Sequence, residues 1–182
     1  MSMDIKDLTK KKRKKAKSKQ QKEKEIKNEV VSFDIGSEYT KLVVGKYYKG
    51  KLIINKYLEF ETPKDCVKDG LIINEKILAD KIQILLNENK IKAKYASFTT
   101  NSTTIINREI LIPKVEEDEV ESVIKFEMEQ YLPINLNDYI VQYIEQDEIK
   151  QDDNIKIKVY VIAYPEKMAR GYYDLLKSLK LK

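Results

Sequence analysis

The 182-residue sequence contains no histidine, no tryptophan and only one cysteine. Histidine is the commonest general base and the commonest transition-metal ligand in proteins, so its absence disfavours both kinds of chemistry. The single cysteine, Cys66, excludes an internal disulfide and a zinc site built from cysteines. No apolar run approaches the roughly 20 residues that span a bilayer, and the N-terminus lacks the apolar core of a secretory signal. We therefore expect a cytosolic module and do not expect catalysis by this chain.

Positive charge is concentrated at the N-terminus. Residues 1–28 hold 12 basic and 4 acidic side chains, a net charge of +8, while the remaining 154 residues carry −3. With almost no apolar side chain between Lys10 and Lys24, the tail 1–28 is predicted to be disordered on its own. Residues 6–27 are expected to hold the protein near an anionic membrane surface, at about 1 kcal/mol per basic residue. Non-specific nucleic-acid binding ranks lower because no aromatic residue interleaves the lysines, and a solubilising tail without a partner is the simplest alternative.

The most informative stretch is residues 30–45, in which one apolar strand ends, the chain turns, and a second apolar strand begins. Gly, Ser and Thr at this turn are expected to direct backbone amides and two hydroxyls into one concavity that suits a phosphate. An aspartate at the end of the first strand is placed to orient a hydrated magnesium ion, and a lysine adds positive charge. The alternative is an ordinary hairpin turn that favours Gly and Ser. The candidate cofactor-binding residues are Asp34, Gly36, Ser37, Thr40 and Lys41.

The remaining sequence predicts an alternation of strands and helices. Strands are indicated by alternating apolar residues between turn residues, and helices by apolar residues at three- and four-residue spacing. The predicted elements are strands at 29–34, 41–47 and 51–60, a loop at 63–70, a helix at 75–87 capped by Asn74, strands at 94–99 and 104–112, a helix at 116–131, strands at 138–146 and 155–163 around a polar turn at 151–154, and a last helix starting at Pro165.

Each predicted helix has an apolar face. In the helix at 116–131, four acidic residues at 116–119 occupy the predicted first turn, where the helix dipole favours negative charge. This explains them more simply than a metal site, because cation sites need oxygens that converge from several directions. The predicted buried residues are Ile77, Leu78, Ile82, Leu85 and Leu86 in the first helix, Val120, Val123, Ile124, Met128 and Tyr131 in the second, and Met168, Tyr172, Leu175, Leu176 and Leu179 in the last.

The hairpin around Asp34 resembles the first phosphate motif of the actin-like ATPase superfamily. Four further stretches make the chain similar to the PilM family of type IV pilus assembly. The most specific contains Ile124-Lys-Phe-Glu-Met-Glu-Gln-Tyr-Leu-Pro133-Ile, which looks like that family's acidic helix and its Tyr-hydrophobic-Pro ending. The resemblance covers roughly residues 29–182, and family members are about twice this length. The four stretches are 67–72, 106–113, 117–143 and 160–164 followed by the last helix.

The resemblance implies an α/β fold, the first half of an actin-like (ribonuclease H-like) protein with an inserted small α+β subdomain of the 1C type. It places residues 29–94 and 164–182 in an incomplete subdomain 1A and residues 95–163 in the insertion. The sequence has no second phosphate loop and no Gly-Gly turn for adenosine. ATP and magnesium are therefore expected only for a longer form of the protein.

The resemblance also implies a function in protein contacts. In this family, a groove between the insertion and the nucleotide-binding subdomain takes up a short extended segment of a membrane partner, PilN. We therefore expect a cytoplasmic scaffold of a type IV pilus or related secretion platform, peripheral at the inner face of the cell membrane. The alternatives are the N-terminal half of a sugar or acyl kinase of the same superfamily and a cell-division scaffold of the FtsA type.

Overall fold

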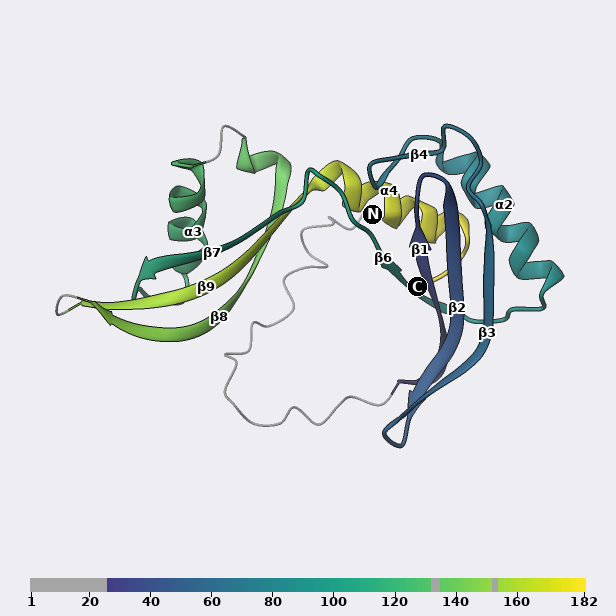
Figure 1. The fold of residues 1–182 in the computed structure, drawn as a ribbon, viewed down its shortest axis with the longest axis horizontal. Helices are drawn as coiled ribbons and strands as arrows, with labels where there is room; N and C mark the ends of the chain where they lie inside the picture. The colour runs from purple at the N-terminus through teal and green to yellow at the C-terminus, as the bar shows by residue number, and fades with distance from the viewer. Residues whose placement is uncertain (1–25, 132–134, 152–153) are drawn as a thin grey trace. The chain divides into compact units, whose positions relative to one another are not determined.

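The computed structural model of the chain describes residues 26–131, 135–151 and 154–182. These residues form two units (Figure 1). One unit consists of residues 26–103 together with Lys167–Lys182, and the other of Thr104–Glu166. Each unit has its own sheet and its own buried apolar residues. We call them the first unit and the second unit.

The first unit is built on a four-stranded sheet with strand order β3-β2-β1-β6. The first three strands run antiparallel through two tight turns, and β6 lies parallel to β1. The parallel pairing requires a crossover, which a helix supplies, as is usual for parallel strands. Each of the four predicted strands is confirmed, and most are longer than predicted. The strands are β1 (Ile26–Ile35), β2 (Tyr39–Tyr48), β3 (Lys51–Glu61) and β6 (Tyr95–Thr99).

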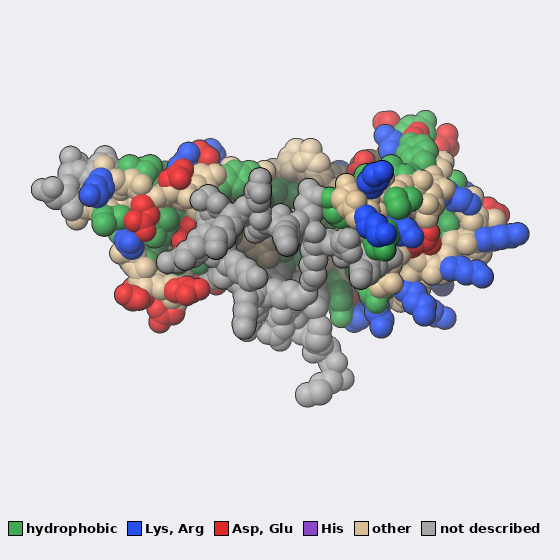
Figure 2. Space-filling view, turned by 90° about the horizontal axis from the view of Figure 1, so that it is seen from below, with side chains coloured by type: hydrophobic (Ala, Val, Ile, Leu, Met, Phe, Trp, Pro, Cys, Tyr) green, Lys and Arg blue, Asp and Glu red, His purple; other side chains and the backbone are tan. Residues whose placement is uncertain are grey.

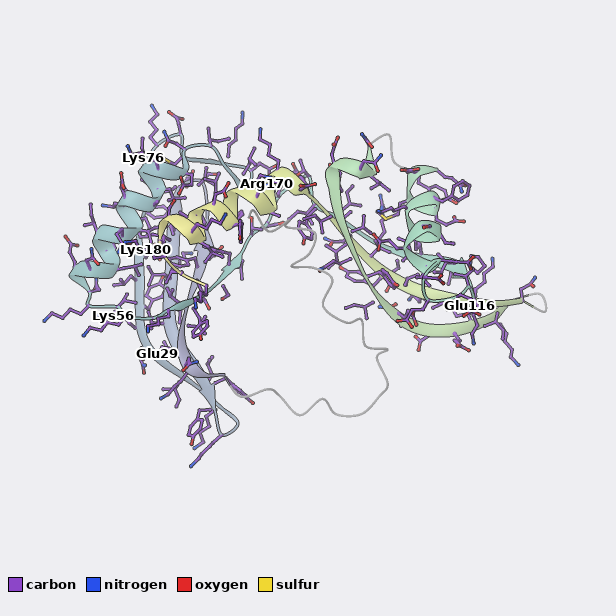
Figure 3. The ribbon with its side chains drawn as sticks, turned by 180° about the vertical axis from the view of Figure 1, so that it is seen from behind. Glu29, Lys56, Lys76, Glu116, Arg170 and Lys180 are labelled. Atoms are coloured by element: carbon purple, nitrogen blue, oxygen red, sulfur yellow. The ribbon has the colours of Figure 1, made fainter. Side chains whose placement is uncertain are left out.

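Two helices, α2 (Glu75–Glu88) and α4 (Glu166–Ser178), cover one face of this sheet. The ring of Phe33 in β1 stacks on that of Phe98 in β6, with centroids 5.3 Å apart, and Phe98 packs against the tilted ring of Tyr172 in α4 at 5.2 Å. At the other helix, Lys56 Nζ of β3 donates a hydrogen bond to the carbonyl of Asn89 at 2.8 Å (Figure 3). The buried apolar residues of the first unit are Val31, Phe33, Ile35, Leu42, Val44, Cys66, Val67, Leu78, Ala79, Ile82, Leu86, Met168, Tyr172, Leu175 and Leu179.

Asn74 caps α2 as predicted, because the amide of Ile77 donates to Asn74 Oδ1 at 3.2 Å. The predicted buried face of α2 is partly wrong: Ile77 is 50% exposed, and Ala79 is buried in its place. The predicted loop 63–70 also contains structure, since β4 (Val67–Lys68) pairs with β5 (Leu71–Ile72). Their turn has positive φ at both central residues, Asp69 and Gly70, as tight hairpins require.

The second unit is a three-stranded antiparallel sheet with strand order β7-β9-β8 and one helix, α3. Every second residue of the central strand β9, from Ile157 to Ala163, is buried, which is the pattern of a sheet packed on one face. The elements are β7 (Ile106–Pro113), α3 (Val120–Glu129), a 3₁₀ turn η1 (Leu136–Asp138), β8 (Tyr139–Gln151) and β9 (Asn154–Pro165). The core consists of Ile112, Val120, Ile124, Met128, Leu136, Val141, Ile157, Val159, Val161 and Ala163.

The predicted helix at 116–131 is too long at both ends. Glu116–Glu119 precede α3, so these four acidic residues do not occupy its first turn (Figure 3 labels Glu116). Glu119 is the N-cap residue and makes no side-chain capping bond. Tyr131, predicted to be buried, lies past the end of the helix and is 75% exposed. Sequence periodicity extended the helix here because acidic and apolar residues continue its pattern on both sides.

The division into units differs from the predicted domains. Residues 95–99 were assigned to the insertion, but they pair with β1 inside the first unit's sheet, so the second unit begins at Thr104. The last helix starts at Glu166 and not at Pro165, which ends β9. Of the predicted disordered tail 1–28, residues 1–25 lie outside the described residues, whereas 26–28 belong to β1. Within the described ranges, no helix combines the length and apolar character needed to cross a membrane.

Candidate functional site

The candidate site is the turn between β1 and β2. Side chains alternate along β1, and because Phe33 and Ile35 point into the core, Asp34 points to the opposite face of the sheet. The register places Lys41 of β2 directly across from Asp34, and Glu59 of β3 directly across from Lys41. All three side chains are exposed. The turn therefore has an acidic and a basic side chain at its base, on the sheet face that α2 and α4 leave open.

This open face is polar near the turn and apolar away from it. Thr99 of β6 lies beside Asp34 in register, and the hydroxyls of Ser32 and Ser97 are 2.7 Å apart, one donating to the other. Farther from the turn the same face carries large exposed apolar side chains. They are Leu52 (69% exposed), Ile54 (57%), Tyr57 (55%) and Tyr95 (41%). The polar end alone suits an anion and its counterion.

The turn itself is held by hydrogen bonds from the sheet side. The amide of Gly36 donates to the carbonyl of Tyr39 at 3.0 Å. The amide of Thr62, just past β3, donates to the carbonyl of Glu38 at 2.8 Å. The Thr62 hydroxyl donates to the carbonyl of Gly36, also at 2.8 Å. Gly36 is required here because a Cβ atom at this position would lie 2.8 Å from the Tyr39 carbonyl oxygen.

Thr40 does not occupy the predicted position. Its side chain is fully buried, and its hydroxyl lies 2.8 Å from that of Thr62. The register pairs Thr40 with Ile35, so it faces the helix-covered side of the sheet and not the concavity. The structure thus brings Asp34, Lys41 and the turn at 36–37 together and leaves Thr40 out. Sequence reasoning missed Thr62, for which the only signal was a hydroxyl residue closing the third strand.

A cavity of about 660 Å³ lies beside the turn. Ser37 is the only predicted site residue on its wall. Its charged lining is mixed, with three carboxylates against two lysines, so it has no net preference for an anion. Its volume is within the range of small-molecule sites. The lining residues are Ser37, Glu38, Tyr39, Glu61, Thr62, Lys64, Asp65, Val67, Lys68 and Ile73.

Magnesium has one candidate ligand here, Asp34. In the described part of the chain, no three side chains of the metal-binding types His, Cys, Asp and Glu gather. Magnesium usually keeps several waters and takes one or two carboxylates together with substrate phosphates. An exposed Asp34 beside this turn would fit that mode through water, and Lys41 would fit a phosphate oxygen.

Comparison with solved structures gives the fold. The chain is similar to a solved PilM–PilN type IV pilus biogenesis complex, with a TM-score of 0.68 and 20% identity over 84% of this chain. It is also similar to the cytoplasmic domain of EpsL, an inner-membrane component of the type II secretion system of Vibrio cholerae, with a TM-score of 0.56 and 9% identity over 85% of this chain. The matches cover 45% and 56% of those chains, so this chain spans about half of their length.

Comparison of sequences gives the family. No curated protein matches the chain. The model of the family described as type IV pilus assembly protein PilM matches residues 32–167, which include the candidate turn and the whole of the second unit. The predicted fold class is confirmed: the chain has an actin-like α/β fold with an inserted α+β unit. The chain belongs to the PilM family of type IV pilus assembly proteins.

Proposed function

We propose that this chain is a cytoplasmic platform component of type IV pilus assembly that binds the cytoplasmic N-terminal segment of a PilN-like membrane protein. Family membership supports the role in pilus assembly. The similar solved structure is a complex of PilM with PilN, which supports the kind of partner. The observation on this chain that carries the proposal is an unpaired, regular strand edge in the second unit.

That edge belongs to β7. In the strand order β7-β9-β8, both β7 and β8 are edge strands. The ladder of β7 with β9 is unbroken from residue 106 to 113, whereas that of β8 with β9 shifts between Glu145 and Glu148. Irregular, charged edges discourage strand addition, so β7 is the better acceptor. An extended peptide would take its affinity from main-chain bonds along β7 and its specificity from neighbouring side chains such as Leu111, which is 43% exposed.

The charge of the second unit indicates which peptides it favours. Residues 104–166 hold 15 acidic and 6 basic side chains, a net charge of −9. Figure 2 shows acidic side chains gathered on this unit, at the left of the view. Complementary charge mainly raises the rate and selectivity of association. A partner segment carrying lysine or arginine is therefore favoured, and its binding should weaken as salt rises.

The test uses a synthetic peptide that copies the cytoplasmic N-terminus of the PilN-like protein encoded in the same genome. Two further peptides are N-methylated at alternate positions, so that each loses the amides of one edge only. Because each net hydrogen bond contributes about 1 kcal/mol, the peptide methylated on the paired edge should lose about tenfold or more in affinity. The other methylated peptide should bind nearly as well as the parent. Equal affinity of both would exclude strand addition.

Protein variants locate the surface. Leu111→Glu on β7 should weaken binding, because a charged side chain replaces the exposed leucine next to the proposed peptide. The matched control is Phe126→Glu on α3, which replaces another exposed apolar side chain of the same unit, 64% exposed, with the same charged residue. The reverse order of effects would move the binding surface from β7 to the helix. Neither residue is in the core, so both variants should remain folded.

The β1–β2 turn supports a second role, binding of nucleotide phosphate in a longer form of the protein. The supporting observation is the pairing of Asp34 with Lys41 beside the turn on the open sheet face. When bound, ATP with magnesium would supply a negatively charged ligand that links the two halves of an actin-like fold. Calorimetry of the 182-residue chain with Mg-ATP should show little heat, because one hairpin encloses too little of a nucleotide. Micromolar affinity would contradict this half-site argument.

The alternative assignments make different demands. The kinase alternative requires a second phosphate loop and a catalytic carboxylate in a further segment, together with phosphoryl transfer to a small substrate. The FtsA-type alternative requires co-sedimentation with cell-division proteins and no affinity for the PilN-like peptide. The peptide experiment above separates the pilus-platform proposal from both.

A further inference from the structure

We propose that Thr62 is the residue that aims the backbone amides of the β1–β2 turn toward a bound phosphate. The proposal rests on the phosphate-binding role proposed above for this turn, and it concerns how the turn acquires its shape. Thr62 lies outside the motif at 34–41, and it is buried, with 7% of its surface exposed. Its role follows from three contacts and from the planarity of the peptide bond.

The hydrogen bonds around Thr62 have a single consistent direction. A threonine hydroxyl carries one hydrogen, and that of Thr62 donates to the carbonyl of Gly36 at 2.8 Å. The 2.8 Å contact between the hydroxyls of Thr40 and Thr62 must then be donated by Thr40. The relay runs from Thr40 through Thr62 to Gly36. Chains of hydrogen bonds polarise one another, which strengthens the terminal bond to Gly36.

Two carbonyls of the turn are thereby turned toward Thr62. Its hydroxyl binds the carbonyl of Gly36, and its amide binds the carbonyl of Glu38 at 2.8 Å. In a planar trans peptide, the N–H points opposite to the carbonyl of the same unit. The N–H groups of Ser37 and Tyr39 therefore point away from Thr62. Backbone amides of one turn aimed to the same side form the kind of concavity that binds anions.

In an ordinary two-residue hairpin, the carbonyl at the position of Gly36 accepts the amide three residues on. Here the Thr62 hydroxyl takes that carbonyl instead, and the remaining contact of the turn is the amide of Gly36 donating to Tyr39 at 3.0 Å. The hydroxyl of Thr62 thus makes the hydrogen bonding of this turn differ from that of an ordinary hairpin. This also assigns Thr40 a part in the site: it does not contact a ligand, but it fixes the direction of the Thr62 hydroxyl.

The test compares Thr62→Val, which removes the hydroxyl at nearly constant shape, with Thr62→Ser, which retains it. Residual dipolar couplings of the Ser37 and Tyr39 amides in the isotope-labelled 182-residue chain report the orientation of these N–H bonds. The Ser37 coupling should change in Thr62→Val, which loses the bond to the Gly36 carbonyl, and stay near the wild-type value in Thr62→Ser. The Tyr39 coupling should stay near the wild-type value in both variants, because the Thr62 amide that binds the Glu38 carbonyl is retained. Ile82→Val, a core change in α2 away from the turn, controls for lost stability and should leave them unchanged. A wild-type Ser37 coupling in Thr62→Val would overturn the proposal.

A second arm measures binding by following the same amides during titration with sodium pyrophosphate and with Mg-ATP at fixed ionic strength. Weak, saturating shifts are expected for the wild type and Thr62→Ser, and about tenfold weaker binding for Thr62→Val, the loss of about one charge-assisted hydrogen bond. Wild-type shifts with equal affinity in Thr62→Val would overturn the positioning role. If the wild type shows no shifts while the couplings still depend on Thr62, the phosphate-binding role fails and the orienting role of Thr62 stands.

Discussion

The hydroxyl of Tyr172 offers a sharp test of how the C-terminal helix α4 is attached to the first unit. It donates to the carbonyl of Gly70 at 3.0 Å in the β4–β5 turn, and it lies 3.0 Å from the hydroxyl of Thr100. Because a tyrosine hydroxyl has one hydrogen, Thr100 donates in the second bond. Tyr172→Phe removes both bonds and keeps the aromatic ring that packs on Phe98.

The two hydrogen bonds of the Tyr172 hydroxyl should contribute unequally to the stability of the fold. Gly70 is buried, so its carbonyl loses its donor away from water, which costs about 1–2 kcal/mol. Thr100 is exposed and can turn its hydroxyl to solvent, which costs about 0.5 kcal/mol or less. We therefore expect Tyr172→Phe to lower the free energy of unfolding by about 1–2 kcal/mol. That corresponds to a decrease in Tm of about 3–6 °C for a protein of this size.

The assay is urea unfolding followed by circular dichroism, with Tyr173→Phe as the matched control. Tyr173 is the next residue of α4, and its ring lies under Lys177 Nζ at 4.4 Å. Its change to phenylalanine should alter stability by less than about 0.5 kcal/mol, as is usual for surface substitutions. Equal effects of the two substitutions would refute the argument that the Tyr172 hydroxyl anchors α4.

The same hydroxyl predicts a dependence on pH. Burial, foremost, and the nearby charge of Asp34 raise the pKa of Tyr172, although the bond from Thr100 opposes them. The folded state therefore holds this proton more tightly than the unfolded chain, in which tyrosine titrates near pH 10. The contribution is fully present below pH 10 and is lost as the pH rises through the raised pKa of the folded state. Wild-type stability should fall above about pH 10, and Tyr172→Phe should fall less steeply.

Three further predictions concern other parts of the chain. Gly70→Ala should lower the free energy of unfolding by about 2–3 kcal/mol or more, because φ is +72° and a Cβ would lie 2.7 Å from the Asn101 carbonyl oxygen. Gly50→Ala, at φ +73° with nothing within 4 Å, should lower it by about 1 kcal/mol. Equal losses of stability in chemical unfolding would contradict the clash at Gly70. Ile124→Ala should cost about 2–5 kcal/mol because this side chain is fully buried, and an unfolding midpoint near wild type would show that α3 packs differently. Binding to anionic vesicles should fall steeply between about 50 and 200 mM salt and vanish without residues 6–27, while equal binding to neutral vesicles would exclude an electrostatic tether.

Local patterns predicted the elements of this fold well, because strands and helices bury alternate or three- and four-spaced residues. The pattern of β9, for example, is visible in the sequence and confirmed by the burial of Ile157, Val159, Val161 and Ala163. The end of a helix is a weaker signal. Acidic residues at 116–119 continue the helical pattern but lie before α3, and the N-cap residue Glu119 makes no side-chain capping bond. Capping geometry, not periodicity, decides such boundaries.

Pairings between distant residues were harder to predict. Residues 95–99 read as a strand, yet nothing local tells whether that strand pairs with the insertion or with β1, 65 residues earlier. The site had the same difficulty. The motif at 34–41 located the turn and its charged residues, but the side of the sheet that Thr40 faces depends on the register of β1 with β2. Thr62 enters the site only through the pairing of β2 with β3.

The net charge of each unit differs from the net charge of the whole chain, and the charge of the unit is the one that matters for binding. Taken together, residues 29–182 carry only −3, which suggests a nearly neutral domain behind a basic tail. Once the units are known, these residues, together with residues 26–28 and their Lys27, separate into a second unit of −9 and a first unit, residues 26–103 with 167–182, of +7. Charges in water are screened beyond about 8 Å at physiological salt, less than the radius of about 13 Å expected for a domain of 100 residues. A partner therefore senses the charge of the unit that it approaches and not the net +5 of the chain. One protein can therefore bind a basic peptide with its second unit and an anionic surface with its N-terminal residues. Raising the salt concentration should weaken both kinds of binding.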